Sequence, residues 1–173
     1  ASEIAPWVKT GGLGDVAGAL PTALAEAGAE VRVLVPAYPR IVEAFPRRRL
    51  LARLDSPGGA LGAGTLWQAR PSEGPAILMV DAPVHFARAG NPYLDPQGRD
   101  WPDNALRFGL LSRVAALLAA DPSTLGWAPD VLHCNDWQSA LAPAYLRYLH
   151  GGAGAASVVT VHNLAFQGLF EAT

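Results

Sequence analysis

The sequence predicts an α/β protein with a doubly wound, mainly parallel sheet and an inserted β-hairpin. Short runs of β-branched and aliphatic residues alternate with longer stretches rich in alanine and leucine, which is the pattern of strands alternating with helices. The short runs show little polar alternation, as expected of parallel strands that helices cover on both faces. Two further runs, "LLARL" and "GTLWQAR", flank the glycine-rich stretch "DSPGGALGA" and therefore predict the antiparallel hairpin.

The individual elements follow from these patterns. We expect strands at residues 31–36, 76–81, 130–135 and 157–162, and helices at about 13–27, 103–119 and 137–149. Pro21 cannot donate a hydrogen bond to the Ala17 carbonyl, so the first helix should kink or restart there. In the second helix four apolar residues recur at helical spacing and should face the core: Leu106, Leu110, Val114 and Leu117.

Composition narrows the classes of function. The chain of 173 residues is 50% hydrophobic and carries a net charge of −2, which is enough apolar content for a core but gives no basic field for nucleic acid. We find no apolar run long enough to cross a bilayer and no secretory signal, so we expect no membrane partner. The single cysteine, Cys134, fits a reducing compartment, and we therefore expect a cytoplasmic location.

The stretch "WVKTGGLGDVAGALP" places the only lysine of the chain, Lys9, just before Gly11, Gly12 and Gly14. A helix that begins after these glycines points free N–H groups and the positive end of its dipole at the loop. A lysine ammonium beside the helix start adds a positive charge. The pattern therefore favours a loop that binds phosphate.

Three interpretations of these glycines compete. In the first, they only make a tight turn between a strand and a helix. In the second, Gly12, Gly14 and Ala17 match the G-x-G-x-x-G/A turn of dinucleotide-binding folds, but the next strand, "VRVLVPAYP", ends without the acidic residue that holds the ribose. A nucleoside-triphosphate loop fits less well, because its lysine follows the glycines. The third interpretation is the diphosphate of a nucleotide sugar, bound at the carboxyl ends of the strands.

Four segments carry a family resemblance: "VKTGGLGDVAGALP", "GNPYLDPQGRDWPDNALRF", "HCNDWQSALAPAYL" and "TVHNLAFQGLF". Their sequence and order resemble the bacterial glycogen synthases and plant starch synthases, which are glycosyltransferases of the GT-B type. One departure is Phe166, where many relatives have tyrosine. The resemblance implies that residues 1–173 are the N-terminal Rossmann-like domain on the glucan-acceptor side, incomplete at both ends, and that the C-terminal nucleotide-sugar domain is absent from this chain.

The resemblance also implies an activity, namely retaining transfer of glucose from ADP-glucose to the non-reducing end of an α-1,4-glucan. The partners are then a nucleotide sugar and a glucan, with no cofactor and no metal. Lys9, Gly11 and Gly12 would bind the diphosphate leaving group, whose negative charge needs fixed dipoles and cations. Asp15 and Tyr93 would contact the sugar or the acceptor, Tyr93 by stacking on a glucan ring. Asp15 alternatively complements the helix dipole, and Tyr93 is alternatively a surface aromatic residue.

Asp136 and His162 end the two late strands, at the edge where an α/β sheet places its ligands. We interpret them as the catalytic residues, which would bond sugar hydroxyls and favour an oxocarbenium-like transition state. Asn163 is a further candidate for substrate binding, and its alternative role is to cap the following turn. His133 and Cys134 face opposite sides of a strand, so we predict that they do not share a metal ion.

Several expectations depend on the length of the chain. We expect residues 1–173 alone not to transfer glucose, because the family's second domain holds most of the nucleotide contacts. The family also begins with an apolar strand that this sequence lacks, and its absence would leave two strands without a neighbour. Two other functions stay open, a noncatalytic module that binds glucan or nucleotide sugar and an NAD-dependent oxidoreductase. The loop at residues 84–102 is long enough to suggest a functional role.

Overall fold

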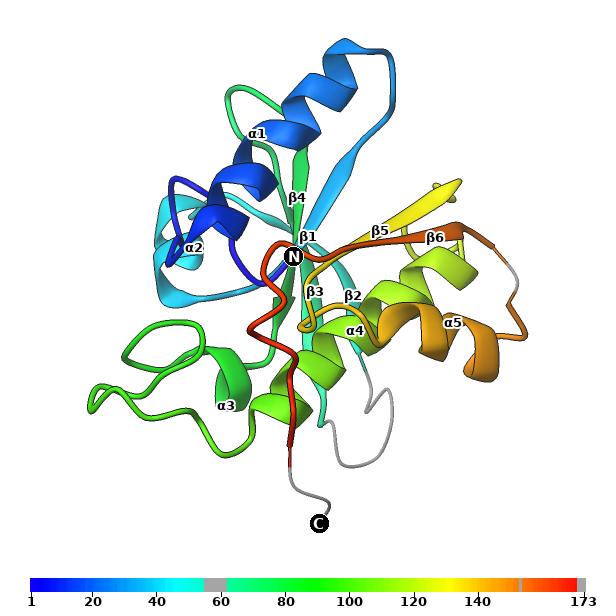
Figure 1. Ribbon diagram of the computed structural model, residues 1–173. Helices are drawn as coiled ribbons and strands as arrows, with labels where there is room; N and C mark the ends of the chain where they lie inside the picture. The colour runs from blue at the N-terminus through cyan, green and yellow to red at the C-terminus, as the bar shows by residue number, and fades with distance from the viewer. Residues whose placement is uncertain (55–61, 153, 171–173) are drawn as a thin grey trace.

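The strands form two sheets in the computed structural model, which describes residues 1–54, 62–152 and 154–170. The larger sheet has the order β1-β4-β3-β2 and consists of β1 (Arg32–Pro36), β4 (Ala76–Asp81), β3 (Gly64–Ala69) and β2 (Arg49–Leu54). The smaller sheet pairs β5 (Val131–Asn135) with β6 (Ala156–Thr160). Figure 1 shows α1 (Gly12–Glu26) and α2 (Pro39–Ala44) to one side of the strands, and α4 (Asn104–Ala120) with α5 (Ala142–Leu149) to the other.

The α/β class and the inserted hairpin are confirmed. Strands β2 and β3 pair antiparallel, and β3 also pairs antiparallel with β4. The parallel pairs are β1 with β4 and β5 with β6, so the larger sheet is mixed rather than mainly parallel. Most of the predicted hairpin turn, residues 55–61, lies outside the described residues.

The core packs α4 and α2 against the larger sheet. Strand β4 is buried at Ile77, Leu78, Met79 and Val80, and Leu110 and Val114 of α4 are completely buried. Burying a side chain of this size contributes about 1.5–3 kcal/mol of hydrophobic stabilisation. In the described part of the chain no helix is both long and apolar enough to cross a bilayer.

Helix α4 corrects the predicted apolar stripe. Leu106 is 41% exposed, whereas its neighbour Arg107 is only 1% exposed. The helix is buried around most of its circumference, by the sheet on one side and by α5 on the other, so a single apolar stripe does not describe it. An arginine therefore occupies an inward position that the periodicity assigned to the leucine next to it.

The structure bears on two other helix predictions. The first helix continues through Pro21, so it does not restart there, and the kink stays a prediction. The third helix, α5, begins at Ala142 rather than near residue 137, and Pro143 lies in its first turn. A proline is favoured in the first turn of a helix, where its missing N–H has no intrahelical partner, so Pro143 agrees with a start at Ala142.

A cavity of about 730 Å³ lies between β1 and β5. Its walls are mainly apolar and include Val33 and Leu34 of β1 and Leu132 of β5. Among the described residues, no strand pairs with β1 or β5 on this side, although the amino group of Ala1 donates to the Leu34 carbonyl at 2.8 Å. The apolar strand that the family resemblance leads us to expect stays a prediction.

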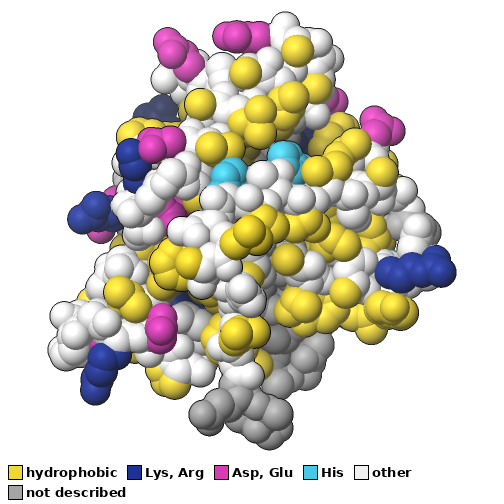
Figure 2. Space-filling view, in the orientation of Figure 1, with side chains coloured by type: hydrophobic (Ala, Val, Ile, Leu, Met, Phe, Trp, Pro, Cys, Tyr) yellow, Lys and Arg dark blue, Asp and Glu magenta, His cyan; other side chains and the backbone are white. Residues whose placement is uncertain are grey.

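Strand β6 and the residues after it expose large apolar side chains rather than being covered on both faces. Figure 2 shows hydrophobic side chains around the histidines near the centre of this face. The large hydrophobic residues exposed in this stretch are Val158, Val159, Val161, Leu164, Phe166, Leu169 and Phe170. The helices that cover the other strands therefore leave this edge of the smaller sheet uncovered.

Candidate functional site

The predicted phosphate loop lies at the start of α1, where Gly11 is the N-cap and no side chain caps the first turn. A Cβ atom added at Gly11 or Gly12 would meet no described atom within 4 Å. Gly11 has φ −158°, an extended conformation that any residue adopts. Neither packing nor backbone conformation therefore requires glycine here, while the open space lets a ligand approach the helix N-terminus closely.

Close packing accounts for two other glycines of the stretch, Gly14 and Gly18, of which only Gly14 belongs to the tight-turn interpretation. A Cβ at Gly14 would lie 3.1 Å from the Cβ of Lys9, and one at Gly18 would lie 2.9 Å from the carbonyl oxygen of Ala5. These glycines allow residues 5–9 to pack closely on α1. The glycines of the stretch thus divide into a pair that the packing needs, Gly14 and Gly18, and a pair that faces open space.

Lys9 and Asp15 are brought together in an ion pair. The Nζ of Lys9 lies 2.8 Å from Oδ2 of Asp15, and the two side chains are 49% and 57% exposed. An exposed pair of this kind contributes only about 0–1 kcal/mol to stability. Asp15 occupies the first turn of α1, where its charge also complements the helix dipole.

Glu3 is a residue of this site that the sequence did not reveal. It is only 2% exposed, and its carboxylate accepts hydrogen bonds from the Thr10 amide at 2.5 Å and from the Thr10 hydroxyl at 2.7 Å. The Thr10 amide is therefore hydrogen-bonded to another residue of the protein. Through this bond Glu3 holds the backbone between Lys9 and Gly11 in place. An acidic residue in "ASE" carries no signal of burial, because its partners lie elsewhere in the chain.

Tyr93 lies in the long loop and reaches the same carboxylate. Its hydroxyl donates to Oε1 of Glu3 at 2.5 Å and lies 2.9 Å from the hydroxyl of Ser2. Burial raises the pKa of Tyr93, and the hydrogen bond to Glu3 raises it further, so the hydroxyl stays protonated and remains a donor. The ring is half-buried and packs at 5.8 Å from that of Phe108. Stacking of Tyr93 on a glucan stays a prediction.

Asp136 and His162 meet at the carboxyl ends of β5 and β6. The amide of His162 donates to Oδ1 of Asp136 at 2.7 Å, and its ring Nε2 lies 3.0 Å from Oδ1 of Asn135. Asp136 has φ 55°, a left-handed conformation that aspartate tolerates better than most residues. Such strained positions cost about 1–3 kcal/mol and cluster at functional sites. The catalytic roles of the two residues stay predictions.

Of three neighbouring residues, two make internal hydrogen bonds and the third is buried. Oδ1 of Asn163 accepts from the Ala165 amide at 2.9 Å, which is the turn-capping role, and its contact with substrate stays a prediction. The ring of His133 bonds the Thr160 hydroxyl at 2.8 Å, and burial lowers the pKa of His133. Cys134 is 1% exposed, and burial raises its pKa to about 11.

Aromatic packing connects these groups. The ring centroids of Tyr93 and Phe108 are 5.8 Å apart, those of Phe108 and Trp137 are 5.2 Å apart, and those of Trp137 and Phe170 are 5.3 Å apart. Trp137 directly follows Asp136 in the chain. Tyr93 therefore joins the glycine loop, through Glu3, to the strand ends that carry Asp136 and His162.

The fold and this site define a doubly wound α/β domain that offers a helix N-terminus and polar strand ends to a ligand. The chain belongs to the family of the starch synthase catalytic domain, whose model matches residues 1–173. It is 60% identical over 169 residues to a glycogen synthase of Dechloromonas aromatica and 51% identical over 173 residues to one of Nitrosospira multiformis. Each alignment covers 98% of this chain and 34% of the relative.

A solved structure shows the same fold. The catalytic domain of starch synthase IV from Arabidopsis thaliana, bound to ADP and acarbose, is 28% identical with a TM-score of 0.73. The match covers 96% of this chain and 34% of that one. The chain thus spans about a third of the length of these relatives.

Proposed function

We propose that this chain is part of a glucosyltransferase of the glycogen and starch synthase type. The enzyme moves glucose from a nucleotide sugar, ADP-glucose, to the non-reducing end of an α-1,4-glucan. The observation that carries the proposal is the open backbone at Gly11 and Gly12, at the start of α1, in a chain that belongs to the starch synthase family. ADP and acarbose in the plant relative support a nucleotide and a glucan as ligands.

The transfer breaks the bond between glucose and a nucleoside diphosphate, so negative charge develops on the leaving oxygen. The N-terminus of α1 and the Lys9 ammonium are fixed positive groups that stabilise such charge. Asp136 and His162 expose polar groups at the adjacent strand ends, where they bond sugar hydroxyls and favour positive charge on the ring as the bond breaks.

Residues 1–173 form the acceptor-side domain of this enzyme. A second, nucleotide-sugar domain supplies most contacts to the nucleotide, so this segment alone does not transfer glucose. Because the relatives are about three times as long, activity belongs to the complete protein. The enzyme works in the cytoplasm without a cofactor or a membrane partner.

The test replaces Lys9 by alanine in the full-length protein. Loss of one stabilising group lowers kcat by about a hundredfold or more, by analogy with other fixed groups that stabilise developing charge. Unfolding stability changes little, because the ion pair with Asp15 is exposed. Arg40→Ala, at an exposed position in α2, is the matched control and leaves transfer unchanged.

Unchanged transfer by Lys9→Ala would refute this role of the lysine. Calorimetry of the full-length protein with ADP-glucose and malto-oligosaccharides tests the function itself. If both ligands bind without any turnover, the protein is a noncatalytic binding module and the proposed function is wrong.

A further inference from the structure

We propose that Arg107 is a positioning residue for the glycine loop, a role that rests on the proposed function. From inside α4 it holds residues 87–103, so that Tyr93 reaches Glu3 and Glu3 in turn fixes Thr10. The catalytic groups themselves do not contact Arg107. Its effect passes through a series of hydrogen bonds that begins at a buried guanidinium and ends at the exposed residue Thr10.

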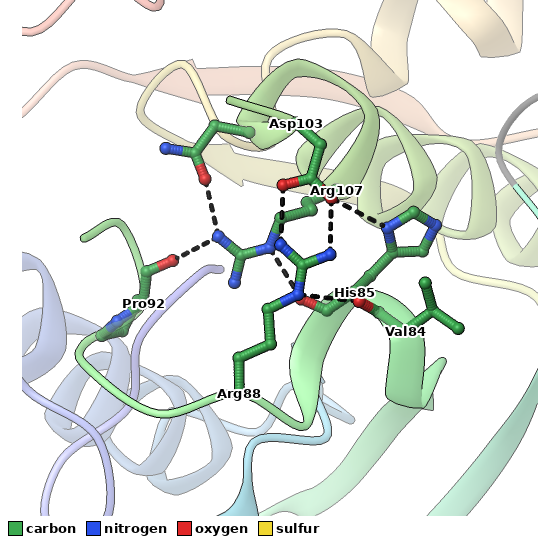
Figure 3. Close-up of polar contacts among 7 residues, drawn as sticks. Val84, His85, Arg88, Pro92, Asp103 and Arg107 are labelled. Atoms are coloured by element: carbon green, nitrogen blue, oxygen red, sulfur yellow. Dashed lines mark hydrogen bonds and ion pairs between the residues drawn. The ribbon is translucent and has the colours of Figure 1, made fainter. Parts of the chain in front are cut away.

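Arg107 is 1% exposed, and its guanidinium is bonded on several sides (Figure 3). Its Nε donates to the His85 carbonyl at 2.7 Å, and its Nη1 donates to the Pro92 carbonyl at 2.9 Å. Nη1 also donates to Oδ1 of Asn104 at 2.6 Å. Burial lowers the pKa of Arg107, and the nearby charge of Arg88 lowers it further.

A buried cation is costly, and apolar side chains would fill the same space without that cost. The planar fork of arginine adds directed hydrogen bonds to fixed acceptors. Here two of the acceptors are backbone carbonyls at either end of residues 85–92. The arginine therefore sets the distance between α3 (Pro83–Phe86) and the start of the "NPY" turn.

The loop has little regular structure and needs such partners for its backbone. Arg88 closes its base with two hydrogen bonds to the Asp103 carboxylate, at 2.7 and 2.6 Å (Figure 3). Burial alone would raise the pKa of Asp103, but the hydrogen bonds and charge of Arg88 outweigh it and hold the pKa below its ordinary value. Arg88 thus closes the loop, and Arg107 fixes the segment that leads to Tyr93.

A continuous series of hydrogen bonds leads from Arg107 to the glycine loop. Asn104, whose Oδ1 accepts from Arg107, donates through Nδ2 to the Tyr93 carbonyl at 3.0 Å. The Tyr93 hydroxyl donates to Glu3, and Glu3 accepts from the Thr10 amide. Thr10 lies between Lys9 and Gly11. A shift at Arg107 therefore reaches the residues that face the leaving group.

The test measures amide hydrogen exchange by NMR in the full-length protein with Arg107→Lys. Lysine keeps the charge but cannot bond three acceptors with the same geometry. We expect exchange of the Thr10 amide to become at least tenfold faster, while amides in β4 stay unchanged. Arg113→Lys is the matched control, because Arg113 lies on the same helix beside Tyr145 of α5, and it should leave Thr10 unchanged.

Faster exchange confined to residues 87–103, with Thr10 unchanged, would show a purely local role and overturn the proposal. An equal rise in β4 would show general destabilisation and would overturn it too. If Arg107→Lys does not fold, Asn104→Ala interrupts the same series one step later and carries the same expectation for Thr10. Combining either variant with Tyr93→Phe should add little to the Thr10 effect, because the two changes act in series.

Kinetics separate this proposal from the function on which it rests. In the transfer assay Arg107→Lys should lower kcat at least fivefold and change the KM for ADP-glucose less than twofold, since the affected loop acts on charge that develops in the transition state. A lower kcat without the Thr10 effect would overturn the positioning role. If the wild-type protein does not transfer glucose, the proposed function fails, whereas the exchange result still decides what Arg107 positions.

Discussion

Replacing Glu3 by glutamine tests how the glycine loop is held. The carboxylate accepts three hydrogen bonds, two from Thr10 and one from Tyr93. Glutamine has the same shape, and its oxygen can accept from the Thr10 amide while its NH₂ group donates to the two hydroxyls. Bonds to a charged acceptor contribute about 1.5–3 kcal/mol and neutral ones about 0.5–1.5 kcal/mol. Relief of the cost of burying a charge offsets part of the difference, so we expect Glu3→Gln to lose about 1–2 kcal/mol of unfolding free energy.

Glu3→Leu differs because it leaves the same donors without an acceptor. A buried donor that loses its partner costs about 1–3 kcal/mol, so two such losses cost about 2–6 kcal/mol. Because Thr10 is exposed and the Tyr93 hydroxyl keeps Ser2 within 2.9 Å, we expect the lower part of this range, about 2–4 kcal/mol. Urea unfolding of the full-length protein measures both values, with Glu43→Gln, an exposed change in α2, as the control within about 0.5 kcal/mol. Glu3→Gln should keep most of the transfer activity, and Glu3→Leu should lose it. Equal stability of the two variants would refute this account of the buried carboxylate.

Three further predictions concern the surroundings of the site. The pKa of Cys134 is raised from 9.0 to about 11, so at pH 8 it should have about a hundredfold less thiolate than an ordinary cysteine. Mass spectrometry should therefore find this cysteine labelled by a maleimide only after the protein unfolds. Asp103 has a lowered pKa, so its charge stabilises the fold above the unfolded pKa of about 4 and loses that effect as the pH falls through the folded value. Urea midpoints of Asp103→Asn and wild type should therefore differ at pH 7 and converge once the pH is below the folded pKa. Gly168→Ala places a Cβ 2.6 Å from the ring of Trp137 at φ 65°, and it should destabilise the protein more than Gly98→Ala, which has φ 79° and nothing within 4 Å; equal unfolding midpoints would contradict the clash.

The sequence pattern predicts best those helices and strands whose formation depends mainly on residues close together in the chain. Strand β4 occupies the predicted residues, because a short aliphatic run between turn residues has few alternatives. The hairpin is recovered for the same reason. Helix α4 begins and ends within one residue of its prediction, yet its inward face is wrong at Leu106 and Arg107. Which positions of a helix are buried depends on how many neighbours surround it, and the sequence of one helix does not contain that information.

The site also contains residues that a local motif predicts and residues whose role depends on distant partners. Gly11 and Gly12 are predicted from a short motif, and the open space before α1 agrees with a ligand role. Glu3 is not predicted, because its burial depends on Thr10, seven residues away, and on Tyr93, ninety residues away. Arg107 is missed for a similar reason, since a charged residue in a helix is ordinarily assigned to solvent. Buried polar groups are recognisable only when their partners are known.

The ion pair between Lys9 and Asp15 would not oppose the diphosphate that we propose binds at the glycine loop. An exposed pair contributes about 0–1 kcal/mol, and about half of each side chain is exposed. A phosphate group at the N-terminus of α1 gains about 0.3–1 kcal/mol from the helix dipole, and each hydrogen bond that it accepts from a charged donor contributes about 1.5–3 kcal/mol. The proposed ligand would therefore give the lysine more than it would lose by leaving Asp15. Asp15 holds the ammonium beside the loop, and the contacts of Glu3 would keep that loop in place if the lysine moved.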